Sequence, residues 1–560
     1  VSLTMSKPNT TMANPRTLHT DVLVVGYGPV GAAIACLLGL YGVRTIVIDK
    51  ADDVLTMPRA IALDNEALRI LQMAGLAEDA FARIAIPYVR MHCPYVGEFA
   101  RMNTSGSIDG HAKLVTFYQP DLERALRAKV AEYPNVEPLL GVELKGLVQD
   151  DSGVWATLHS RDGSPLRIRA KYLVGADGAA SVVRGAIGQE FKGRSYAEDW
   201  LIVDAQNVPK PIDHVEFLCD HHRPTPHMVA PGGRERWEFM LKPGETREQM
   251  EQLDAIRVLL KPWGGPEQMH IERRAVYRFH ARCCESFLKG RVLLAGDAAH
   301  ITPPFVGQGL VAGLRDAANL CWKLAWVVRG HASPEILNSY DRERRPHAKA
   351  MIALARAMGQ VVMPRNAPTA IVVHGFMRLM RVMPSTRRFF EELGAKPKQD
   401  FREGLFASGR GKLRRGGCIP QTIVRDEQGR MCLSDDIFGP HMTLVGFGLD
   451  PSRHLTSRAR EAWSARGGRI VQVCVRGEAL HRGEHLAEDL TGALVPGLAP
   501  YGWAAVLRPD RTVVTDGAVT EAERLVQETL RLFGDGPNQD AEPRDKGPVR
   551  AAAAAPSAGA

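Results

Sequence analysis

The chain has 560 residues, which is more than a single hydrophobic core serves, so about two to four domains are expected. Apolar content of 45% and charged content of 24% are ordinary for a globular protein, and a net charge of +8 is mild for this length. Aromatic residues make up 6%, and no basic run alternates with aromatics. These features argue against a nucleic-acid partner and suit anionic small molecules.

The cysteine pattern indicates reduced thiols. The chain has nine cysteines, an odd number, without a Cys-x-x-Cys, and the adjacent Cys283 and Cys284 are poorly placed to bridge each other. We therefore expect a cytoplasmic protein with no metal site. Residues 1–19 are polar and lack the apolar core of a signal peptide. No run reaches the roughly 18 apolar residues of a membrane helix, so we expect no membrane span.

Residues 22–42, VLVVGYGPVGAAIACLLGLYG, predict a buried strand, a glycine turn and a helix, and a second strand then ends at Asp49. Such glycines allow a tight turn, close approach to a pyrophosphate and close helix packing, while the helix N-terminus offers free N–H groups. The terminal acid suits the hydroxyls of a ribose. This order predicts a dinucleotide site rather than a plain turn, without separating NAD from FAD. The turn consists of Gly26, Gly28, Pro29 and Gly31.

The next segment is expected to hold a helix from near Asp64, a polar irregular region to about Gly110, a strand over 114–119 and a helix opened by Pro120. A strand then ends in Asp177-Gly178, which alone would be read as a surface turn. Residues 193–281 show short strands between Pro and Gly turns, which predicts an antiparallel sheet inserted into the nucleotide-binding domain.

A third motif covers residues 290–310. A buried strand ends at Gly296-Asp297, and a loop containing Pro304 leads to Gly307-Gln308-Gly309, which starts a helix running to about Val328. Its N-terminus would point free N–H groups at an electron-rich ligand, and Asp297 would accept hydrogen bonds from polyol hydroxyls.

Taken together, the three motifs resemble the single-component FAD-dependent aromatic hydroxylases over about residues 20–350. Within that family, PRAIALDNEAL, FYQPDLERAL and RWEFML look most like 3-(3-hydroxyphenyl)propionate/3-hydroxycinnamate hydroxylases, and phenol and resorcinol hydroxylases are near relatives. The C-terminal unit is similar to the thioredoxin-like domain of those enzymes, but without a redox Cys-x-x-Cys we expect it to serve structure or assembly.

The resemblance implies an α/β fold, with a Rossmann-like FAD-binding domain, an inserted antiparallel-sheet substrate domain and a C-terminal thioredoxin-like domain. The expected boundaries are a disordered tail at 1–20, FAD domain at 21–192 and 282–360, sheet domain at 193–281, helical connector at 361–411, thioredoxin-like domain at 412–534 and a disordered tail at 535–560.

The resemblance also implies roles for single residues in binding FAD. The glycine turn with Asp49 would hold the ADP half, and Arg59 and Gln119 would lie near the flavin and its ribityl chain. Asp177 and Gly178 would serve both FAD and NAD(P)H. The third motif would bind the ribityl hydroxyls and bring backbone N–H groups to the pyrimidine edge of the flavin through Gly296, Asp297, Pro304, Gly307, Gln308, Gly309 and Leu310.

The implied reaction is hydroxylation of a phenol ring with O2, through a flavin hydroperoxide. NADH or NADPH would dock transiently, since the sequence holds no second Gly-x-Gly-x-x-Gly domain, and a homodimer is expected. Attack on the ring is helped by an acceptor for the phenol proton. Asp64 and Tyr277 are candidates by motif position, with a helix cap and a half-buried sheet tyrosine as their alternatives.

Residues of the inserted sheet are expected to contact the substrate, namely His227, Arg236, Trp237 and Glu238. For a substrate carboxylate, the sequence does not rank Arg59, Arg236 and Arg278. Other functions stay open: a same-fold enzyme acting on another phenol, an epoxidase or reductase, a binding protein that has lost its chemistry, or a form attached to a membrane through residues 350–385.

Overall fold

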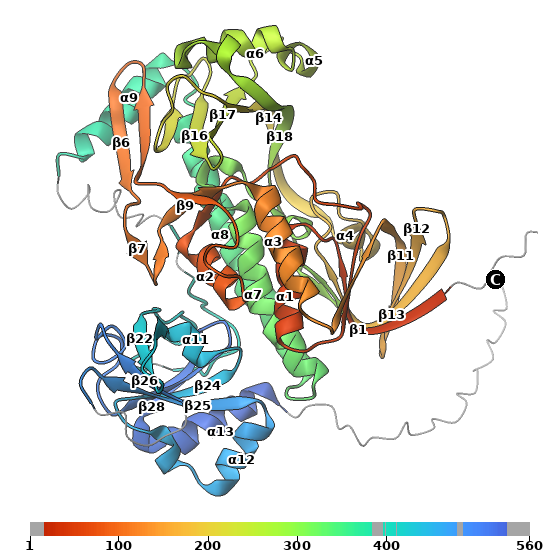
Figure 1. Cartoon of the computed structure of the whole chain (residues 1–560), viewed down its shortest axis with the longest axis vertical. Coiled ribbons are helices and arrows are strands. Elements are labelled where there is room, and N and C mark those ends of the chain that lie inside the picture. The colour runs from red at the N-terminus through yellow and green to blue at the C-terminus, as the bar shows by residue number, and fades with distance from the viewer. Residues whose placement is uncertain (1–15, 384–395, 398, 410, 479–484, 535–560) are drawn as a thin grey trace, which may run out of the picture.

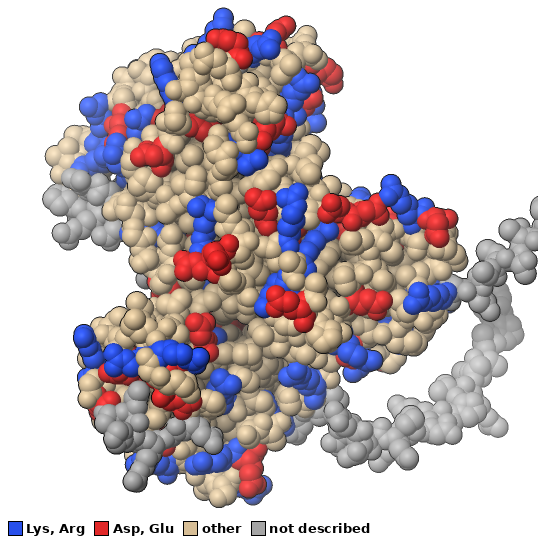
Figure 2. All heavy atoms as spheres, in the orientation of Figure 1, with Lys and Arg blue, Asp and Glu red and all other residues tan. Residues whose placement is uncertain are grey.

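We describe a computed structural model of the chain, which covers residues 16–383, 396–397, 399–409, 411–478 and 485–534. Figure 1 shows the domain of the first and third sequence motifs in the centre, the second sheet at one end and the C-terminal domain at the other. Lysine and arginine are interspersed with aspartate and glutamate on the face drawn in Figure 2, as the mild net charge suggests. None of the described helices is long and apolar enough to cross a membrane.

The central domain is built on a sheet with strand order β10-β2-β1-β13-β12-β11, to which β20 is added beside β13. The parallel strands are apolar because helices cover them; Val22–Val25 is buried throughout. β1 begins at Arg16, before the expected domain start, because residues 16–20 pair with 166–170 of β13. The strands are β1 (Arg16–Val25), β2 (Thr45–Asp49), β10 (Val136–Leu140), β11 (Val142–Asp150), β12 (Gly153–Ser160), β13 (Pro165–Gly175), β19 (Leu288–Lys289) and β20 (Val292–Leu294).

Helix α1 packs on both α3 and α7 and thereby joins the first and third sequence motifs. The expected helix after residue 309 is present with the predicted end. The helices of this domain are α1 (Pro29–Leu40), α2 (Asn65–Met73), α3 (Gln119–Ala131), α4 (Val182–Ala186), α7 (Gly309–Val328) and α8 (Asn338–Val362). Small strands beside them are β3 (Ala62–Asp64), β4 (Arg83–Ala85), β7 (Ser107–Ile108), β8 (His111–Ala112) and β9 (Leu114–Phe117).

The second sheet has the order β21-β18-β14-β17-β16-β15-β5-β6. Strands β5 and β6 lie in the segment that the sequence analysis expected to be irregular, which is a correction. Residues 88–93 alternate between half-buried and buried positions, as in a strand with one face in the core. The polar side chains at every second position were mistaken for an irregular segment. The strands are β5 (Tyr88–Cys93), β6 (Gly97–Asn103), β14 (Phe191–Gln206), β15 (Val215–Leu218), β16 (Thr225–Ala230), β17 (Arg234–Met240), β18 (His270–Cys284) and β21 (His300–Ile301).

The two faces of the second sheet have different neighbours. The outer face packs in one apolar cluster with α6 (Leu253–Leu260), next to α5 (Arg247–Met250). The inner face belongs to a cluster that includes Phe305, from the loop of the third motif, and Val362, at the end of α8. The inner face therefore looks toward the nucleotide-binding domain.

Helix α9 (Ala367–Met380) follows α8 and contacts β6, while residues 384–395 of the expected connector lie outside the described residues. The C-terminal domain has a sheet of order β23-β22-β26-β25-β24-β27-β28. Its elements are β22 (Ile423–Asp426), β23 (Met431–Leu433), α11 (Ser434–Phe438), β24 (Met442–Phe447), α12 (Ser457–Ala465), β25 (Gly468–Val475), β26 (Leu486–Asp489), β27 (Trp503–Leu507), β28 (Val513–Ala518) and α13 (Ala522–Phe533). The two expected tails, apart from residues 16–20, lie outside the described residues.

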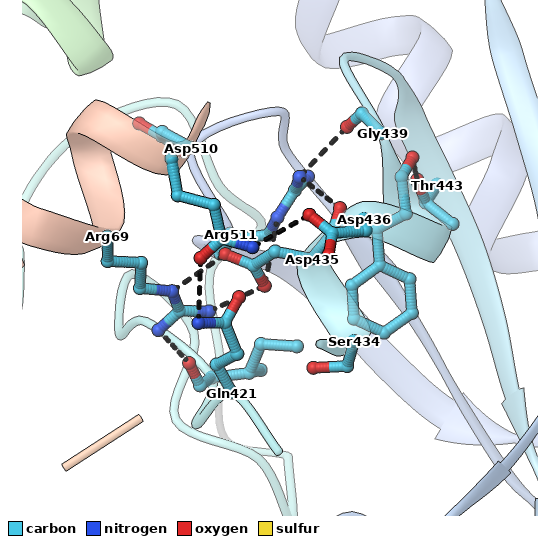
Figure 3. Close-up of polar contacts among 12 residues, drawn as sticks. Arg69, Gln421, Ser434, Asp435, Asp436, Gly439, Thr443, Asp510 and Arg511 are labelled. Carbon is cyan, nitrogen blue, oxygen red and sulfur yellow. Dashed lines mark hydrogen bonds and ion pairs between the residues drawn. The ribbon is translucent and has the colours of Figure 1, made fainter. Parts of the chain in front are cut away.

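Buried ion pairs join the C-terminal domain to the central one. Arg69 of α2 reaches across to Asp435 of α11, beside Arg511 and Gln421 (Figure 3). At a second contact, Arg508 donates to both carboxylate oxygens of Glu343 at 2.8 and 2.9 Å. Charges buried in this way hold the domains in one orientation, because parting them leaves each charge without its partner.

Candidate active site

The first sequence motif forms a turn in which two of the glycines leave no room for a Cβ atom. Gly26 has φ of +100°, and a Cβ there would lie 2.4 Å from the carbonyl oxygen of Ala176. A Cβ on Gly31 would lie 1.9 Å from the carbonyl oxygen of Gly26. Gly28, just before Pro29, has only open space around its missing Cβ and caps α1 without a side-chain hydrogen bond. The N-terminus of α1 is therefore bare, as a pyrophosphate site requires.

Asp49 lies at the end of β2, directly beside this turn. Its carboxylate accepts the N–H of Tyr27 at 2.7 Å and the N–H of Ala51 at 2.8 Å. These bonds fix the carboxylate next to the glycines. Each oxygen keeps a lone pair that can accept a hydrogen bond from a ribose hydroxyl.

Gln119 holds the loop that carries Arg59. Its Oε1 accepts the backbone N–H groups of Arg59 and Ala60, both at 2.8 Å. The side chain of Arg59 is exposed, and its charge acts on the carboxyl group of Asp297. Residues from three separate segments thus meet at one place.

Asp297 follows β20 and is half-buried. Among the described residues, its carboxylate has no hydrogen-bond or ion-pair partner, and burial raises its pKa. Such a group needs a hydrogen-bonding ligand. A polyol chain would satisfy it.

The N-terminus of α7 is the second bare helix end. Gly307 has φ of +62°, Gly309 has open space where a Cβ would lie, and no side chain caps the helix. Two uncapped helix ends and a carboxylate without a partner fit a dinucleotide with a polyol linker, which describes FAD. Pro304 and Leu310 flank this loop, while the amide of Gln308 turns away, toward Asp64.

Gly296 and Asp177 bind the protein rather than opening toward a ligand. The Gly296 N–H donates to Asp316 of α7, and a Cβ on Gly296 would lie 3.1 Å from Val30. The carboxylate of Asp177 accepts the Ser181 hydroxyl and a backbone N–H at the start of α4. The Asp177-Gly178 turn thus supports the glycine turn, since a Cβ on Gly26 would also lie 2.9 Å from the Cα of Asp177.

Asp64 lies in an ion-pair network at the start of α2. It accepts the Ala67 N–H at 2.9 Å and is bonded to Gln308, Arg315 and Lys396 at 3.0, 3.0 and 2.7 Å. Burial raises the pKa of Asp64, but the charges of Lys396 and Arg315 outweigh it and hold that pKa well below its usual range. A carboxylate with four donors is a weak base. This arrangement favours the helix cap, and it ties α2 to the N-terminus of α7.

The inner face of the second sheet carries three rows of side chains across β17, β14 and β18. Register pairs define each row, and alternation along the strands places all three rows on the same face. The rows are Arg236–Asp204–Arg273, Glu238–Ile202–Ala275 and Met240–Trp200–Tyr277.

The first row is a closed charge cluster. Arg236 donates to both oxygens of Asp204 at 2.6 and 2.9 Å and to the carbonyl oxygens of Pro58 and Arg59. Arg273 joins Asp204 and Pro58 as well. The row therefore clamps the loop of residues 58–59 to the sheet, and Arg236 is committed to that contact.

The second and third rows stay open. Glu238 and Tyr277 have no hydrogen-bond or ion-pair partner among the described residues, and neither Glu238 oxygen nor the Tyr277 hydroxyl is sealed from solvent. The ring of Phe305, from the loop of the third motif, lies 5.8 Å from that of Trp200. Apolar side chains and two polar groups without a partner in the described residues thus lie together between the sheet and the loop of the third motif.

Two predicted substrate residues lie elsewhere, which corrects the expectation. His227 and Trp237 point to the outer face, where their rings stack at 4.6 Å under the α6 side of the sheet. His227 also lies 2.5 Å from Glu235. Since neighbouring residues of a strand face opposite sides, Trp237 cannot share a face with Arg236 and Glu238.

The sequence analysis missed the groups that position the site. Asp204, Arg273, Arg315 and Lys396 come from strands, a helix and a connector, and no local motif marks them. Among the described ranges, no three His, Cys, Asp or Glu side chains gather as a metal ion needs.

Comparison with known proteins supports this arrangement. Residues 19–355 match the family described as FAD binding domain, and residues 416–532 match the HcaD C-terminal domain. A 3-(3-hydroxy-phenyl)propionate/3-hydroxycinnamic acid hydroxylase of Burkholderia vietnamiensis is 36% identical over 94% of this chain and 98% of its own. A hydroxylase of the same name from Comamonas testosteroni is 33% identical over 92% and 97%.

Solved structures agree on the fold. The flavin-dependent monooxygenase PieE, in complex with FAD and substrate, superposes with a TM-score of 0.77 over 93% of this chain and all of that one, at 21% identity. The anhydrotetracycline hydroxylase OxyS of Streptomyces rimosus gives 0.73 at 26% identity, over 93% of this chain and all of its own. By its matching domains and full-length relatives, the chain belongs to the FAD-dependent aromatic hydroxylases, flavoprotein monooxygenases that use NAD(P)H and O2.

Proposed function

We propose that the protein hydroxylates 3-(3-hydroxyphenyl)propionate or 3-hydroxycinnamate to the 2,3-dihydroxy product. The observation that carries this proposal is the extent of the similarity. A relative named for these substrates aligns over 94% of this chain, including the sheet that we assign to the substrate side of the site. When bound, FAD supplies the activated oxygen atom, and the chain supplies position, a dry cavity and proton transfer.

For FAD, the proposed roles follow the geometry. The bare turn of Gly26 to Gly31 binds the diphosphate, Asp49 the adenosine ribose and Asp297 the ribityl hydroxyls. The N-terminus of α7 at Gly307–Leu310 stabilises negative charge on the flavin ring through its N–H groups. The clamp on residues 58–60 keeps Arg59 at this site, and Gly178, which has open space where a Cβ would lie, is the point at which we propose that NAD(P)H approaches.

We assign substrate binding to the second and third rows of the inner sheet face. Trp200, Ile202 and Phe305 provide apolar contacts for the ring, and the free hydroxyl of Tyr277 positions it. Among the three arginines considered for the carboxylate, Arg236 and Arg278 are paired with Asp204 and Asp199. No partner of the Arg59 guanidinium lies within the described residues, so Arg59 is left to meet an anionic ligand.

The decisive experiment measures NADH and NADPH oxidation by the purified holoenzyme with and without 3-(3-hydroxyphenyl)propionate. Hydrogen peroxide and dihydroxylated product are quantified in the same reaction. Stimulated oxidation with product equal to the NAD(P)H consumed supports the proposal. Stimulation that yields mostly peroxide favours another phenol or resorcinol, and no stimulation in the presence of bound FAD favours an epoxidase or reductase.

We also propose a homodimer that works in the cytoplasm. Helix α9 exposes a row of large apolar side chains, including Val372, Phe376 and Leu379, which are 62–69% exposed. Such a patch on a chain with no described membrane-spanning helix suits a second protein surface. Light scattering after gel filtration tests this: Phe376→Glu with Leu379→Glu yields monomers if α9 forms the interface. All nine cysteines are free thiols in the described chain, which suits a reducing compartment.

A further inference from the structure

Glu238 is a buried carboxyl group without a protein partner. The residue is 8% exposed, lies in the middle of β17 and belongs to the inner face of the sheet. Its oxygens have no hydrogen bond or ion pair among the described residues, and they are not sealed from solvent. Buried carboxyl groups normally have partners, so this one is placed to receive a ligand.

The charges around Glu238 do not neutralise it. Arg236 and Arg273 act on it from β17 and β18, but both guanidinium groups are committed to Asp204 and the carbonyl of Pro58. Tyr277, from β18, is the other titratable group on this face near the row of Glu238. Its row neighbours Ile202 and Ala275 are apolar, and Ala275 is small. The surface beside the carboxyl group is therefore suited to an aromatic ring.

We propose that Glu238 is the catalytic residue that accepts the proton of the substrate's phenol hydroxyl, an inference that rests on the proposed function. As the O–H bond breaks, the proton passes to a carboxylate oxygen of Glu238. The electron pair passes through the ring to the carbon that forms the new C–O bond. O2 provides that oxygen, NAD(P)H provides two electrons, and the second oxygen atom leaves as water. When the ring regains aromaticity, its C–H proton passes to the second oxygen atom as that atom leaves as water, and Glu238 returns its proton to the phenol oxygen.

The contrast with Asp64 supports this assignment. Burial raises the pKa of Glu238, whereas ion pairs lower that of Asp64. A carboxylate with a raised pKa is the stronger base and shares a proton better with a phenol. Glu238 also faces the apolar rows directly, while Asp64 is occupied by four donors.

The test compares Glu238→Gln with the wild-type holoenzyme, after matching their FAD content by absorbance. For the parent substrate, kcat of hydroxylation is expected to fall about 100- to 10,000-fold, the range for loss of a general base. The loss should shrink for an analogue whose phenol is made more acidic by fluorine on a carbon that is not hydroxylated. The residual rate should also keep rising with pH toward the phenol pKa, about 10. A merely structural role would produce neither trend.

Binding gives a readout independent of turnover. Dissociation constants for 3-(3-hydroxyphenyl)propionate and for 3-phenylpropionate, which lacks the hydroxyl group, are measured through the flavin spectrum. The wild type should prefer the phenol by about 10-fold or more, as for a hydrogen bond to a charged group, and Glu238→Gln should lose most of that preference. Glu235→Gln is the matched control, because this 2% exposed residue lies on the same strand and faces the other side. It should keep the wild-type preference.

Equal kcat in Glu238→Gln and wild type would overturn the proposal, as would a loss independent of phenol acidity. If the glutamine variant does not fold, Glu238→Asp replaces it, and the same dependence on phenol acidity is required. Should the wild type hydroxylate a different phenol, the substrate proposal fails while Glu238 is tested with that phenol. A wild type that hydroxylates no phenol overturns both.

Discussion

Arg69 and Asp435, 366 positions apart in the chain, form a two-point ion pair across the boundary between the central and C-terminal domains. The Nε and Nη2 atoms of Arg69 lie 2.7 and 2.9 Å from the two carboxylate oxygens, and both side chains are at most 6% exposed. Arg69 belongs to α2, the helix that begins at Asp64. The C-terminal domain thus holds the helix that is tied to the N-terminus of α7, which gives it a structural role without redox cysteines.

Breaking this pair should weaken the protein as a whole. Asp435→Asn removes the closer counter-charge of buried Arg69 and leaves its longer contact with Asp109 at 3.4 Å, so about 3 kcal/mol of unfolding free energy should be lost. The neighbouring Asp436→Asn is the control, since that exposed residue accepts one hydrogen bond in the described chain, from Gln72 at 2.7 Å, and should change stability by about 0.5 kcal/mol or less. Urea unfolding of both variants measures the difference. Equal stability of the two would contradict the role of the pair.

The same pair should make the domain contact sensitive to acid. Burial raises the pKa of Asp435, but the charges of Arg69 and Arg511 outweigh it, so that the folded-state pKa lies below the ordinary value. A lowered carboxyl pKa contributes stability that is present above the unfolded pKa, about 3.9, and is lost as pH falls through the folded value. The stability gap between wild type and Asp435→Asn should therefore be largest near pH 7 and shrink below about pH 4. A gap that stays constant to pH 3 would count against this account.

Removing the Asp297 carboxylate should affect the holoenzyme and spare the apoprotein. Asp297→Ala loses an ionised acceptor for the ribityl hydroxyls, so FAD should bind about 10- to 100-fold more weakly. Because the carboxylate has no partner in the described part of the protein, the apoprotein should not become less stable. Flavin fluorescence on release gives the affinity. A variant that keeps wild-type FAD affinity would remove Asp297 from the cofactor site.

Alanine at two glycines of the first motif should separate folding from cofactor binding. In Gly31→Ala, the new Cβ lies 1.9 Å from the Gly26 carbonyl oxygen, so about 3 kcal/mol of stability should be lost together with FAD. In Gly28→Ala, the Cβ meets open space, so the apoprotein should stay stable while FAD binds about tenfold more weakly or worse. Thermal unfolding of apoprotein and FAD titration are measured together. Strong FAD binding by Gly28→Ala would argue that no phosphate lies there.

Asp64→Asn should behave as the loss of a cap and ion-pair partner. Unfolding free energy is expected to fall by about 2 kcal/mol, the scale of a hydrogen bond to a charged group. Glu66→Gln is the matched variant, because Glu66 binds the same Arg315 and Lys396 and should give a similar loss. Any decrease in hydroxylation should be independent of phenol acidity in both. If more acidic phenols restored the hydroxylation rate of Asp64→Asn, Asp64 would be the residue that accepts the phenol proton.

Local patterns predicted the backbone elements of the first and third motifs well. The strand, glycine turn and helix at 22–42 and the helix from Gly309 lie where their periodicity placed them, because both depend on backbone geometry within one short segment. Strands β5 and β6 were missed because β5 joins the sheet by pairing with β15 from a distant part of the chain, and β6 is added beside it as the edge strand.

The substrate half depended on contacts that no short segment contains. Two adjacent residues, Trp237 and Glu238, were expected to act together, yet they face opposite sides of β17. The sequence alone determined the family, the cofactor turn and the bare helix ends, because these follow from glycine spacing and helix starts. Only the tertiary structure decided which carboxyl groups are neutralised. Asp64 is paired with Arg315 and Lys396, from positions about 250 and 330 residues away, while Glu238 has no hydrogen-bond or ion-pair partner in the described part of the chain.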